Sequence, residues 1–382
     1  MGKQKCSSTG DVILPLLSKF STKELIRLEG VSKLWKCLMA ERYFVKLQLK
    51  REIVTGFFYQ GRGQCVEEHC ISFLPVAQSE THNNVLAFLP EPTKIFNSCY
   101  GLLCSSSFHS CAVPSVYISN PLHRKWRKLH WPNPSRESSI TLSFDPFKNP
   151  IDIVTKFKVV IATQNEISTE AGQYFSFDFY SSETEVWTRS IETCLCNHNL
   201  QKEGSICVQG ILYWLTDGNQ IIMFDPEIEK SWLVMVPLPD TQVNKRKMCM
   251  GEAEGKLHYV FISEKGLQVW LLVDYATSIW ELTLTISLEV LDTELQKQKH
   301  FSHFEIGEKL ECDYLTDSAW WVETLSFMDN TLLIKFGGDL FLYMFESRKM
   351  KHFGRIDALG QNDVLSGAAC AYTMSLVPLG EA

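Results

Sequence analysis

The sequence lacks the features that would place it in several large classes of protein. Its 382 residues contain no apolar run of about 18 residues, the length that a membrane-spanning helix needs, and no secretory signal peptide. An excess of basic residues is missing too. The chain has 37 Lys and Arg against 44 Asp and Glu, which leaves a net charge of -7. Without a positive field, the chain is not expected to bind nucleic acid or an anionic membrane. We therefore expect a protein of the cytoplasm, the nucleus or both.

The patterns of an enzyme or a metal-binding protein are missing as well. There is no nucleophile elbow, no phosphate-binding glycine loop and no kinase motif set. Thirteen cysteines are present, but an odd count in a long chain without a signal peptide indicates reduced thiols. None of the Cys and His clusters has the C-x2-C pairs that are typical of structural zinc. These clusters are Cys65 and Cys70 with His69, Cys99 and Cys104 with His109 and Cys111, Cys194 and Cys196 with His198, and His300 and His303 with Glu305. We expect no cofactor, no metal and no enzymatic activity.

What the sequence does contain falls into two parts, and the first is helical. From Asp11 to about Leu49, apolar residues recur at helical spacing, which predicts three short helices, the last beginning at Ala40. Asp11 can cap the first helix, and Ser21 with Glu24 can cap the second. About forty residues bury too little surface to be stable alone, so this segment is expected to pack on its neighbour or on a partner. Apolar residues lie all round the second predicted helix, which leaves one side for a partner.

After residue 55 the sequence consists of short runs rich in aromatic and β-branched residues, such as "FKVVIAT" and "LQVWLLVDY". These runs are separated by turn residues and follow each other too closely for helical crossovers. They predict an antiparallel all-β domain built mostly from hairpins.

A recurring turn signature divides this second part into units. A strand ends in a polar or Asx residue, often followed by Pro, and a Trp comes six or seven residues later. The anchors are Asn120-Pro121 with Trp126, Ser181-Ser182 with Trp187, Asp225-Pro226 with Trp232, Asp274-Tyr275 with Trp280 and, in degenerate form, Glu346-Ser347 with His352. Such a turn returns the chain so that the indole can lie between neighbouring sheets. The anchors lie 44 to 72 residues apart, which is similar to the length of a propeller blade.

Five propeller units are therefore readable, and degenerate units around 55–95, 139–163 and 355–382 could raise the count. Gly101, Gly210 and Gly255 open three of the units with a residue that permits a positive φ. The charged, helix-friendly segment 288–314 interrupts the β pattern. It is either a solvated insertion or an element that contacts a partner, because long loops are commonly functional and charged runs are commonly solvated.

The helical segment resembles the F-box of the large plant group of F-box proteins. Val31-Ser32-Lys33-Leu34-Trp35 is similar to that group's CVSKSW step, and Phe44 to Leu49 is similar to its Phe-Val-x-x-His/Gln-Leu ending. The second part resembles the F-box-associated and kelch-like domains of the same proteins. There, the segment from Ser98 to Cys104 looks like Ser-Cys-Asn-Gly-Leu-Leu-Cys, and "ISNPLHRKWRKLHWP" looks like Asn-Pro-x-Thr-x-x-Trp-x-x-Leu-Pro.

This resemblance implies an α+β multidomain chain in which a small helical F-box precedes an all-β, kelch-like propeller. Residues 1–10 would be a flexible N-terminus, 11–51 the F-box, and 52–94 a connecting segment with the first propeller strands. Residues 95–382 would be the F-box-associated β-propeller, with the charged insertion at about 288–314.

The function that the resemblance implies is that of the substrate-recognition subunit of an SCF-type E3 ubiquitin ligase. The F-box would hold a Skp-type adaptor, and through it a cullin, and the propeller would bind a protein target whose identity the sequence does not reveal. Catalysis would be by proximity, with no covalent step on this chain. The adaptor-binding residues would be Leu16, Leu17, Leu25, Val31 and Trp35.

Two other functions stay open. Ser8 and Thr9 stand where the family has a Leu-Pro pair, which leaves room for a propeller scaffold with a degenerate F-box and no ligase role. That alternative predicts that Val31 and Trp35 are buried against the propeller, whereas a receptor predicts an exposed apolar patch. A propeller enzyme or sugar-binding module is the third possibility. It would need convergent polar groups with shifted pKa values in the central channel.

Overall fold

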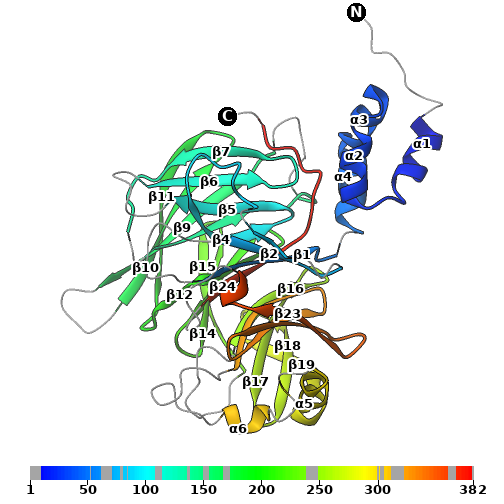
Figure 1. Ribbon diagram of the computed structural model, residues 1–382. Helices are drawn as coiled ribbons and strands as arrows, with labels where there is room; N and C mark the ends of the chain where they lie inside the picture. Colours follow the sequence, from blue (N-terminus) through cyan, green and yellow to red (C-terminus); the bar gives the residue numbers. More distant parts are fainter. Residues whose placement is uncertain are drawn as a thin grey trace, which may run out of the picture.

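The computed structural model consists of four short helices followed by a ring of β-sheets (Figure 1). It describes residues 10–51, 53–61, 71–77, 81–83, 85–107, 114–135, 138–148, 155–166, 173–237, 248–298, 301, 305–310, 322–359 and 367–380. Within this part of the chain, no helix is both long enough and apolar enough to cross a bilayer.

The N-terminal helices number four, whereas the sequence predicted three. They are α1 Gly10–Leu17, α2 Thr22–Leu28, α3 Lys33–Met39 and α4 Arg42–Leu49. The predicted second helix is divided because the chain turns after Leu28 and Ser32 begins a new helix. The Ser32 hydroxyl accepts a hydrogen bond from the backbone N–H of Leu34 at 3.2 Å, which is the N-cap of α3.

The predicted cap of α2 is confirmed. The Ser21 side chain accepts a hydrogen bond from the Glu24 backbone, and the Glu24 carboxylate accepts one from the Ser21 N–H at 2.8 Å, so the two residues form a capping box. The cap predicted for the first helix is wrong, because α1 already begins at Gly10 and Asp11 lies inside its first turn.

The β part of the described chain forms six four-stranded blades, in which the first strand lies nearest the centre of the ring. Blade 1 is β4 Thr93–Cys99, β5 Leu102–Ser107, β6 Ser115–Asn120 and β7 Lys125–His130; blade 2 is β8 Ser138–Ser143, β9 Lys158–Glu166, β10 Gln173–Ser181 and β11 Val186–Leu195; blade 3 is β12 Leu200–Val208, β13 Ile211–Thr216, β14 Gln220–Asp225 and β15 Lys230–Met235. Blade 4 is β16 Met248–Ala253, β17 Lys256–Ser263, β18 Gly266–Asp274 and β19 Ile279–Ile286; blade 5 is β20 Val322–Met328, β21 Thr331–Phe336, β22 Asp339–Met344 and β23 Lys349–Arg355; blade 6 is β24 Gly367–Tyr372, β1 Gly56–Gly61, β2 Ile71–Pro75 and β3 His82–Asn83.

The first strands of the blades contact one another around the centre of the ring. Neighbouring strands within each blade are antiparallel. Blades 4 and 5 are further joined into one eight-stranded sheet, because β16 and β20 pair in parallel with Gly251 opposite Phe327 and Glu252 opposite Met328.

Blade 6 closes the ring with both ends of the chain. Its first strand, β24, pairs with β1 from Gly56 opposite Tyr372 to Gly61 opposite Gly367. The two degenerate units predicted around 55–95 and 355–382 are therefore one blade. The third degenerate unit, around 139–163, supplies β8 and part of β9 of blade 2. The described residues thus form one blade more than the five units that were readable in the sequence.

The turn signature read in the sequence lies at the connection between the third and fourth strands of a blade. In three blades the carboxylate or amide oxygen accepts a hydrogen bond from the backbone N–H two residues on, as expected of an Asx turn. These bonds join Asn120 to Leu122 at 3.0 Å, Asp225 to Glu227 at 2.8 Å and Asp274 to Ala276 at 2.9 Å.

Two of the anchor tryptophans lie between blades, as predicted. The Trp232 ring on blade 3 meets Tyr275 of blade 4 edge to face, with 5.4 Å between ring centroids. The Trp280 indole on blade 4 donates a hydrogen bond to the Met235 carbonyl of blade 3 at 2.7 Å.

The antiparallel order of the strands gives the ring two unlike faces. The connections from first to second and from third to fourth strands all lie on one side, which we call the turn face. Within the described residues, every non-glycine residue with a positive φ is in one of these turns: Tyr100, Arg124, Glu185, Gln209, Glu229, Glu254, Ser278, Asp329, Asn330 and Arg348. The opposite side, the loop face, carries the connections between blades and between second and third strands.

The segment 288–314 leaves β19 on the loop face, and its described part is helical. It forms α5 Leu288–Gln296 and α6 Ile306–Leu310, and the 3-10 helix η1 Asp357–Leu359 follows blade 5 on the same face. Leu291 and Leu295 of α5 are fully buried in a core shared with blades 4 and 5. The helices are therefore packed on the propeller on one side and are not a wholly solvated insertion.

The helical segment 10–51 packs on the turn face (Figure 1). Glu29 lies with its carboxylate 3.8 Å from Nε2 of His123, in the turn that ends β6. Lys50 lies over the ring of Phe147, just after β8, at 5.7 Å. The C-terminal residues 373–380 leave β24 on this face too, where Asn120 donates hydrogen bonds to the carbonyls of Ser375 and Val377 at 3.1 and 2.9 Å.

Candidate functional site

Exposed apolar side chains cover part of the helical segment. Val31, in the turn between α2 and α3, is 66% exposed, and Tyr43 of α4 is 70% exposed. Leu16 in α1 is 54% exposed, and Phe20, three residues after α1, is 41% exposed. Such side chains lose hydrophobic free energy by staying in water, so several on one small segment mark a surface that a partner can cover.

The five predicted adaptor-binding residues fall into three groups. Leu16 and Val31 are exposed, and Trp35 is half-buried against the helical core. Leu17 and Leu25 are 1% and 0% exposed, because they form the interior of the segment together with Leu38, Met39, Phe44, Val45 and Leu49. In this arrangement Leu17 and Leu25 therefore lie in the core of the segment, whereas Leu16, Val31 and Trp35 have surface in solvent. Adaptor contact through the five residues stays a prediction.

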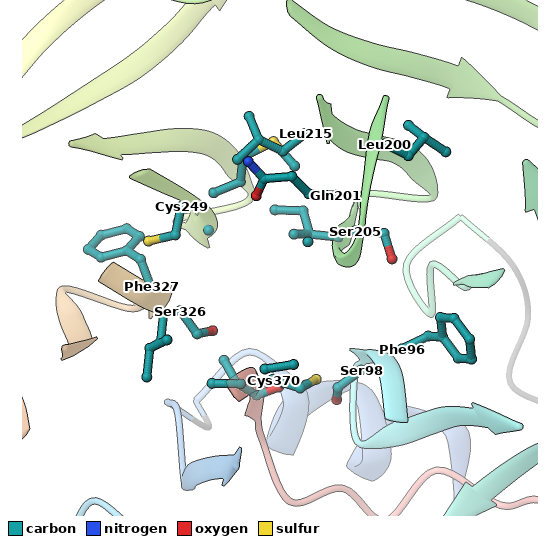
Figure 2. Close-up of a pocket in the computed structure, with 18 of the residues that line it drawn as sticks. Phe96, Ser98, Leu200, Gln201, Ser205, Leu215, Cys249, Ser326, Phe327 and Cys370 are labelled. Atoms are coloured by element: carbon teal, nitrogen blue, oxygen red, sulfur yellow. Dashed lines mark hydrogen bonds between the residues drawn. The ribbon is translucent and has the colours of Figure 1, made fainter. Parts of the chain in front are cut away.

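The second candidate site is a cavity of about 800 Å³ at the centre of the ring (Figure 2). Its wall is built mainly by the first strands of the blades, and Figure 2 shows side chains from several of them around one opening. The residues labelled there are Phe96, Ser98, Leu200, Gln201, Ser205, Leu215, Cys249, Ser326, Phe327 and Cys370. This volume lies within the range of pockets that enclose a drug-sized ligand.

A hydrogen-bonded row of polar side chains lies at the loop-face end of the cavity. The Gln164 amide donates to Oδ1 of Asn199 at 2.8 Å, and the Asn199 amide donates to Oδ2 of Asp217 at 2.8 Å. His198 places Nδ1 3.7 Å from Oδ1 of the same Asp217. These bonds fix the side chains before a ligand arrives, so this rim is preorganised for polar contacts.

The cavity wall holds three carboxyl groups, of which one has a raised pKa and a second is paired with a lysine. Burial, and secondarily the charge of Asp329, raise the pKa of Glu252 to about 7. Glu323 is buried beside Nζ of Lys335, at 3.3 Å, so its charge is compensated. The remaining carboxyl, Asp217, accepts the bonds from Asn199.

The cavity thiols are not activated. Burial raises the pKa of Cys249 and of Cys370 to about 12, so both stay protonated at neutral pH. Among the described lining residues, no Ser hydroxyl or Cys thiol is hydrogen-bonded to a side chain that could act as a base, as nucleophilic catalysis requires. Glu252 is a carboxyl of this wall with a strongly raised pKa, and no motif in the sequence pointed to it.

The candidate metal clusters lie partly outside the described residues: Cys65, His69, Cys70, His109, Cys111, His300 and His303. Of the others, Cys99, Cys104, Cys194 and Cys196 are buried free thiols. Within the described part of the chain, no group of three or more His, Cys, Asp and Glu could hold a metal ion.

Comparison with known proteins identifies the propeller. The family model described as "F-box protein At3g26010-like, beta-propeller" matches residues 68–298, which is more than half of the chain. The matched residues lie in the middle of the chain and not at its C-terminal end, where we predicted the domain, although strands of the ring continue to Tyr372. The matched family is not described as kelch-like, so that part of the prediction is not supported by the match.

Curated relatives carry similar names. The F-box protein At5g49610 of Arabidopsis thaliana is 26% identical over 302 residues, which are 74% of this chain and 79% of that protein. The putative F-box/kelch-repeat protein At1g20790 of the same plant is 28% identical over 233 residues, which are 59% of this chain but only 49% of that protein. Among solved structures, TolB from Acinetobacter baumannii matches with a TM-score of 0.40 and 10% identity, covering 87% of this chain and 72% of that chain. A structural likeness at that level carries no argument about function.

The six-bladed ring agrees with the description of the matched family, and the relatives named above are called F-box proteins. The chain therefore belongs to the plant F-box protein family with an At3g26010-like β-propeller domain.

Proposed function

We propose that this chain is the substrate-recognition subunit of an SCF-type E3 ubiquitin ligase. In this proposal residues 11–51 are an F-box that docks on a Skp-type adaptor, and through it on a cullin, while the propeller holds a protein target. The target would be modified because it is held near a bound ubiquitin-conjugating enzyme, with no covalent step on this chain. The finding that supports this most directly is the apolar surface of the helical segment, above all Val31, which is 66% exposed.

The alternative, a propeller scaffold with a degenerate F-box, requires Val31 and Trp35 to be buried against the propeller. Val31 is exposed and Trp35 is only half-buried, while Glu29 and Lys50 contact the propeller. The family membership favours the receptor as well, because the relatives are named F-box proteins. An enzymatic function has less support, since the cavity wall offers no activated nucleophile among its described residues.

The test is a calorimetric titration of a recombinant Skp-type adaptor into the full chain. We expect a dissociation constant of micromolar or tighter for the wild type. Val31→Asp should weaken binding at least tenfold, because it places a charge in an apolar interface without any partner for it. Leu25→Ala, which opens the core of the segment, should also weaken binding but should lower the melting temperature at the same time.

The matched control is Ile191→Asp, which puts the same charge on an exposed apolar residue of β11 in the propeller, 99% in solvent. Its adaptor binding should equal that of the wild type. If the folded wild-type chain binds no Skp-type adaptor, or if Val31→Asp binds as tightly as Ile191→Asp, the receptor proposal fails and the scaffold becomes the better account.

A further inference from the structure

The loop face and the turn face of the propeller are available to different partners. The helical segment and the residues just after it touch the ring through His123, Phe147 and Asp329, and all three lie on the turn face. The third contact is a hydrogen bond of 2.7 Å from the backbone N–H of Val54 to the Asp329 carboxylate. In the part of the chain that the structure describes, a partner held by the helices therefore lies on the side away from the loop-face end of the central cavity.

The rim of the cavity at the loop face is polar. It contains the amides of Gln164, Asn199 and Gln201 and the hydroxyls of Ser106 and Ser138. In Figure 2 Gln201 of β12 lies beside Leu215 at the edge of the opening, and its amide donates a hydrogen bond to the Thr216 carbonyl at 3.3 Å. Amides and hydroxyls can both donate and accept, so they suit a ligand that does the same. Deeper in the wall, the hydroxyl of Ser205 is buried without a hydrogen-bond partner, so a ligand group that reached it would gain a bond.

The same wall is poor in positive charge. Lys94 is the only cationic residue among the described residues that line the cavity, and its ammonium group lies over the ring of Phe96 at 5.4 Å. Recognition of a phosphate or an acidic segment commonly uses clusters of Arg or Lys. A cationic ligand is not favoured either. Glu323 is already paired with Lys335, the pKa of Glu252 is raised to about 7, and Asp217 already accepts two hydrogen bonds from Asn199. A charged group brought into this cavity would lose hydration without a matching counter-charge.

We propose that the loop-face mouth of the cavity binds a short, uncharged polar segment of the target protein, rich in Ser, Thr, Asn or Gln and free of phosphate. This inference rests on the proposed function, because it takes the occupant to be part of a protein target. It goes further in naming the face of the propeller, the residues at the mouth and the chemical class of the segment. The degradation signal would then be recognised without prior phosphorylation.

The probe is a displayed library of random eight-residue peptides, selected on the immobilised full chain. We expect the selected peptides to be depleted in Asp, Glu, Lys and Arg and enriched in hydroxyl and amide side chains. Synthetic copies should bind the wild type and lose at least tenfold in affinity to Gln201→Trp, which narrows the mouth. The control Lys349→Trp adds the same side chain at an exposed position of β23 and should bind like the wild type.

Charge is tested with the same peptides. Replacing one Ser or Thr of each by its phosphorylated form should weaken binding to the wild type at least tenfold. The variant Gln201→Arg should recover part of that loss, because it places a cation at the mouth. The proposal is overturned if phosphorylated or acidic peptides bind the wild type as tightly, if Gln201→Trp has no effect, or if no peptide is enriched.

Adaptor titrations on the same preparations separate this inference from the proposed function. Adaptor binding without selected peptides would refute the uncharged-segment site and leave the receptor role standing. Selected peptides that Gln201→Trp blocks, on a chain that binds no adaptor, would refute the receptor role and keep the binding site.

Discussion

At the scale of single residues, the surroundings of Glu252 change its pKa strongly. This residue ends the parallel pairing of β16 with β20, so it lies beside the turn that contains Asp329. Its Oε1 accepts a hydrogen bond from the backbone N–H of Gly255 at 3.1 Å, which favours the charged form. Burial and the Asp329 charge outweigh that bond and raise the pKa to about 7. Burial raises the pKa of Asp329 as well.

A pH dependence of stability follows from this pKa. Because the folded chain holds the Glu252 proton more tightly than the unfolded chain, the contribution is fully present below about pH 4.5 and is lost as the pH rises through about 7. Glu252→Gln cannot ionise, so we expect it to raise the free energy of unfolding at pH 8 by about 1–3 kcal/mol, with little gain at pH 5. Urea unfolding at both pH values measures this.

The control for that experiment is Glu254→Gln, which removes a charge from an exposed neighbour in the same turn. Its unfolding free energy should differ from the wild type by a similar small amount at the two pH values. An equal gain for Glu252→Gln at pH 5 and pH 8 would contradict the raised pKa.

Sequence patterns located some functional residues and missed others. Ser21 as a cap, and Asn120, Asp225 and Asp274 as turn residues, were predictable because their side chains bond to backbone a few positions away. Glu252 and Gln201 were not, because their surroundings come from strands that are distant in the sequence. Leu17 and Leu25 were assigned to contact because an apolar residue on a helix looks the same in sequence whether it faces a core or a partner.

At the scale of elements, the hairpin of β20 and β21 contains a buried ion pair. Glu323 and Lys335 are directly opposite in the antiparallel register, with Nζ and Oε2 3.3 Å apart and almost no exposed side-chain surface. Burial removes both charged groups from water, so each group relies on the opposite charge beside it for stabilisation. The hairpin is therefore sensitive to losing one partner alone.

Single and double substitutions of this pair should show that the two residues are coupled. Lys335→Met removes the positive charge 3.3 Å from the buried Glu323 carboxylate. We expect it to cost about 3–5 kcal/mol of unfolding free energy at pH 7, measured by urea unfolding. The double variant Glu323→Gln/Lys335→Met should be clearly more stable than Lys335→Met. Lys349→Met, at an exposed position, should cost little. If the double variant were less stable than the single one, the pair would not be coupled as the structure indicates.

Hairpins could be predicted from the sequence where characteristic turn residues mark the connection between two strands. The hairpins of blades 1, 3 and 4 follow from Asx turns and the tryptophans after them, since both ends of each hairpin are close in sequence. The break between α2 and α3 was missed, because the apolar spacing continues across Gly30 and only the Ser32 cap marks a new start. The burial of Leu291 in α5 was also missed, because the few apolar residues of this helix lie in a segment whose composition is mostly charged and polar.

At the scale of the whole molecule, blade 6 decides whether the ring is closed. Its first strand comes from the C-terminal side of the chain and the other three from the N-terminal side. The chain after β24 adds further contacts, because Met374 donates its backbone N–H to the Thr55 hydroxyl at 2.9 Å and Val377 is fully buried. Such pairing between distant segments could not be read from the sequence, which offered two separate degenerate units instead.

Truncation after residue 366 should therefore open the ring. It removes β24 and the buried residues that follow, and it leaves the edges of β1, β4 and β20 without their neighbour. We expect a loss of cooperative thermal unfolding, or a fall in melting temperature of more than about 10 °C, since several kcal/mol of burial are lost. Truncation after residue 380 is the control and should behave like the full chain. Unchanged melting of the shorter variant would contradict closure by blade 6.

The mixed origin of blade 6 also bears on how a cell makes this protein. About 300 residues separate β1 from β24, and at 5–20 residues per second a ribosome needs about 15–60 s to add them. Throughout that time the β1 edge that β24 will cover stays open to strands of other nascent chains. The exposure ends only when β24 has been synthesised and has paired with β1. The demand of this protein for chaperones should thus depend on elongation speed, and slowing the ribosome downstream of β3 should lower its yield more than slowing it upstream.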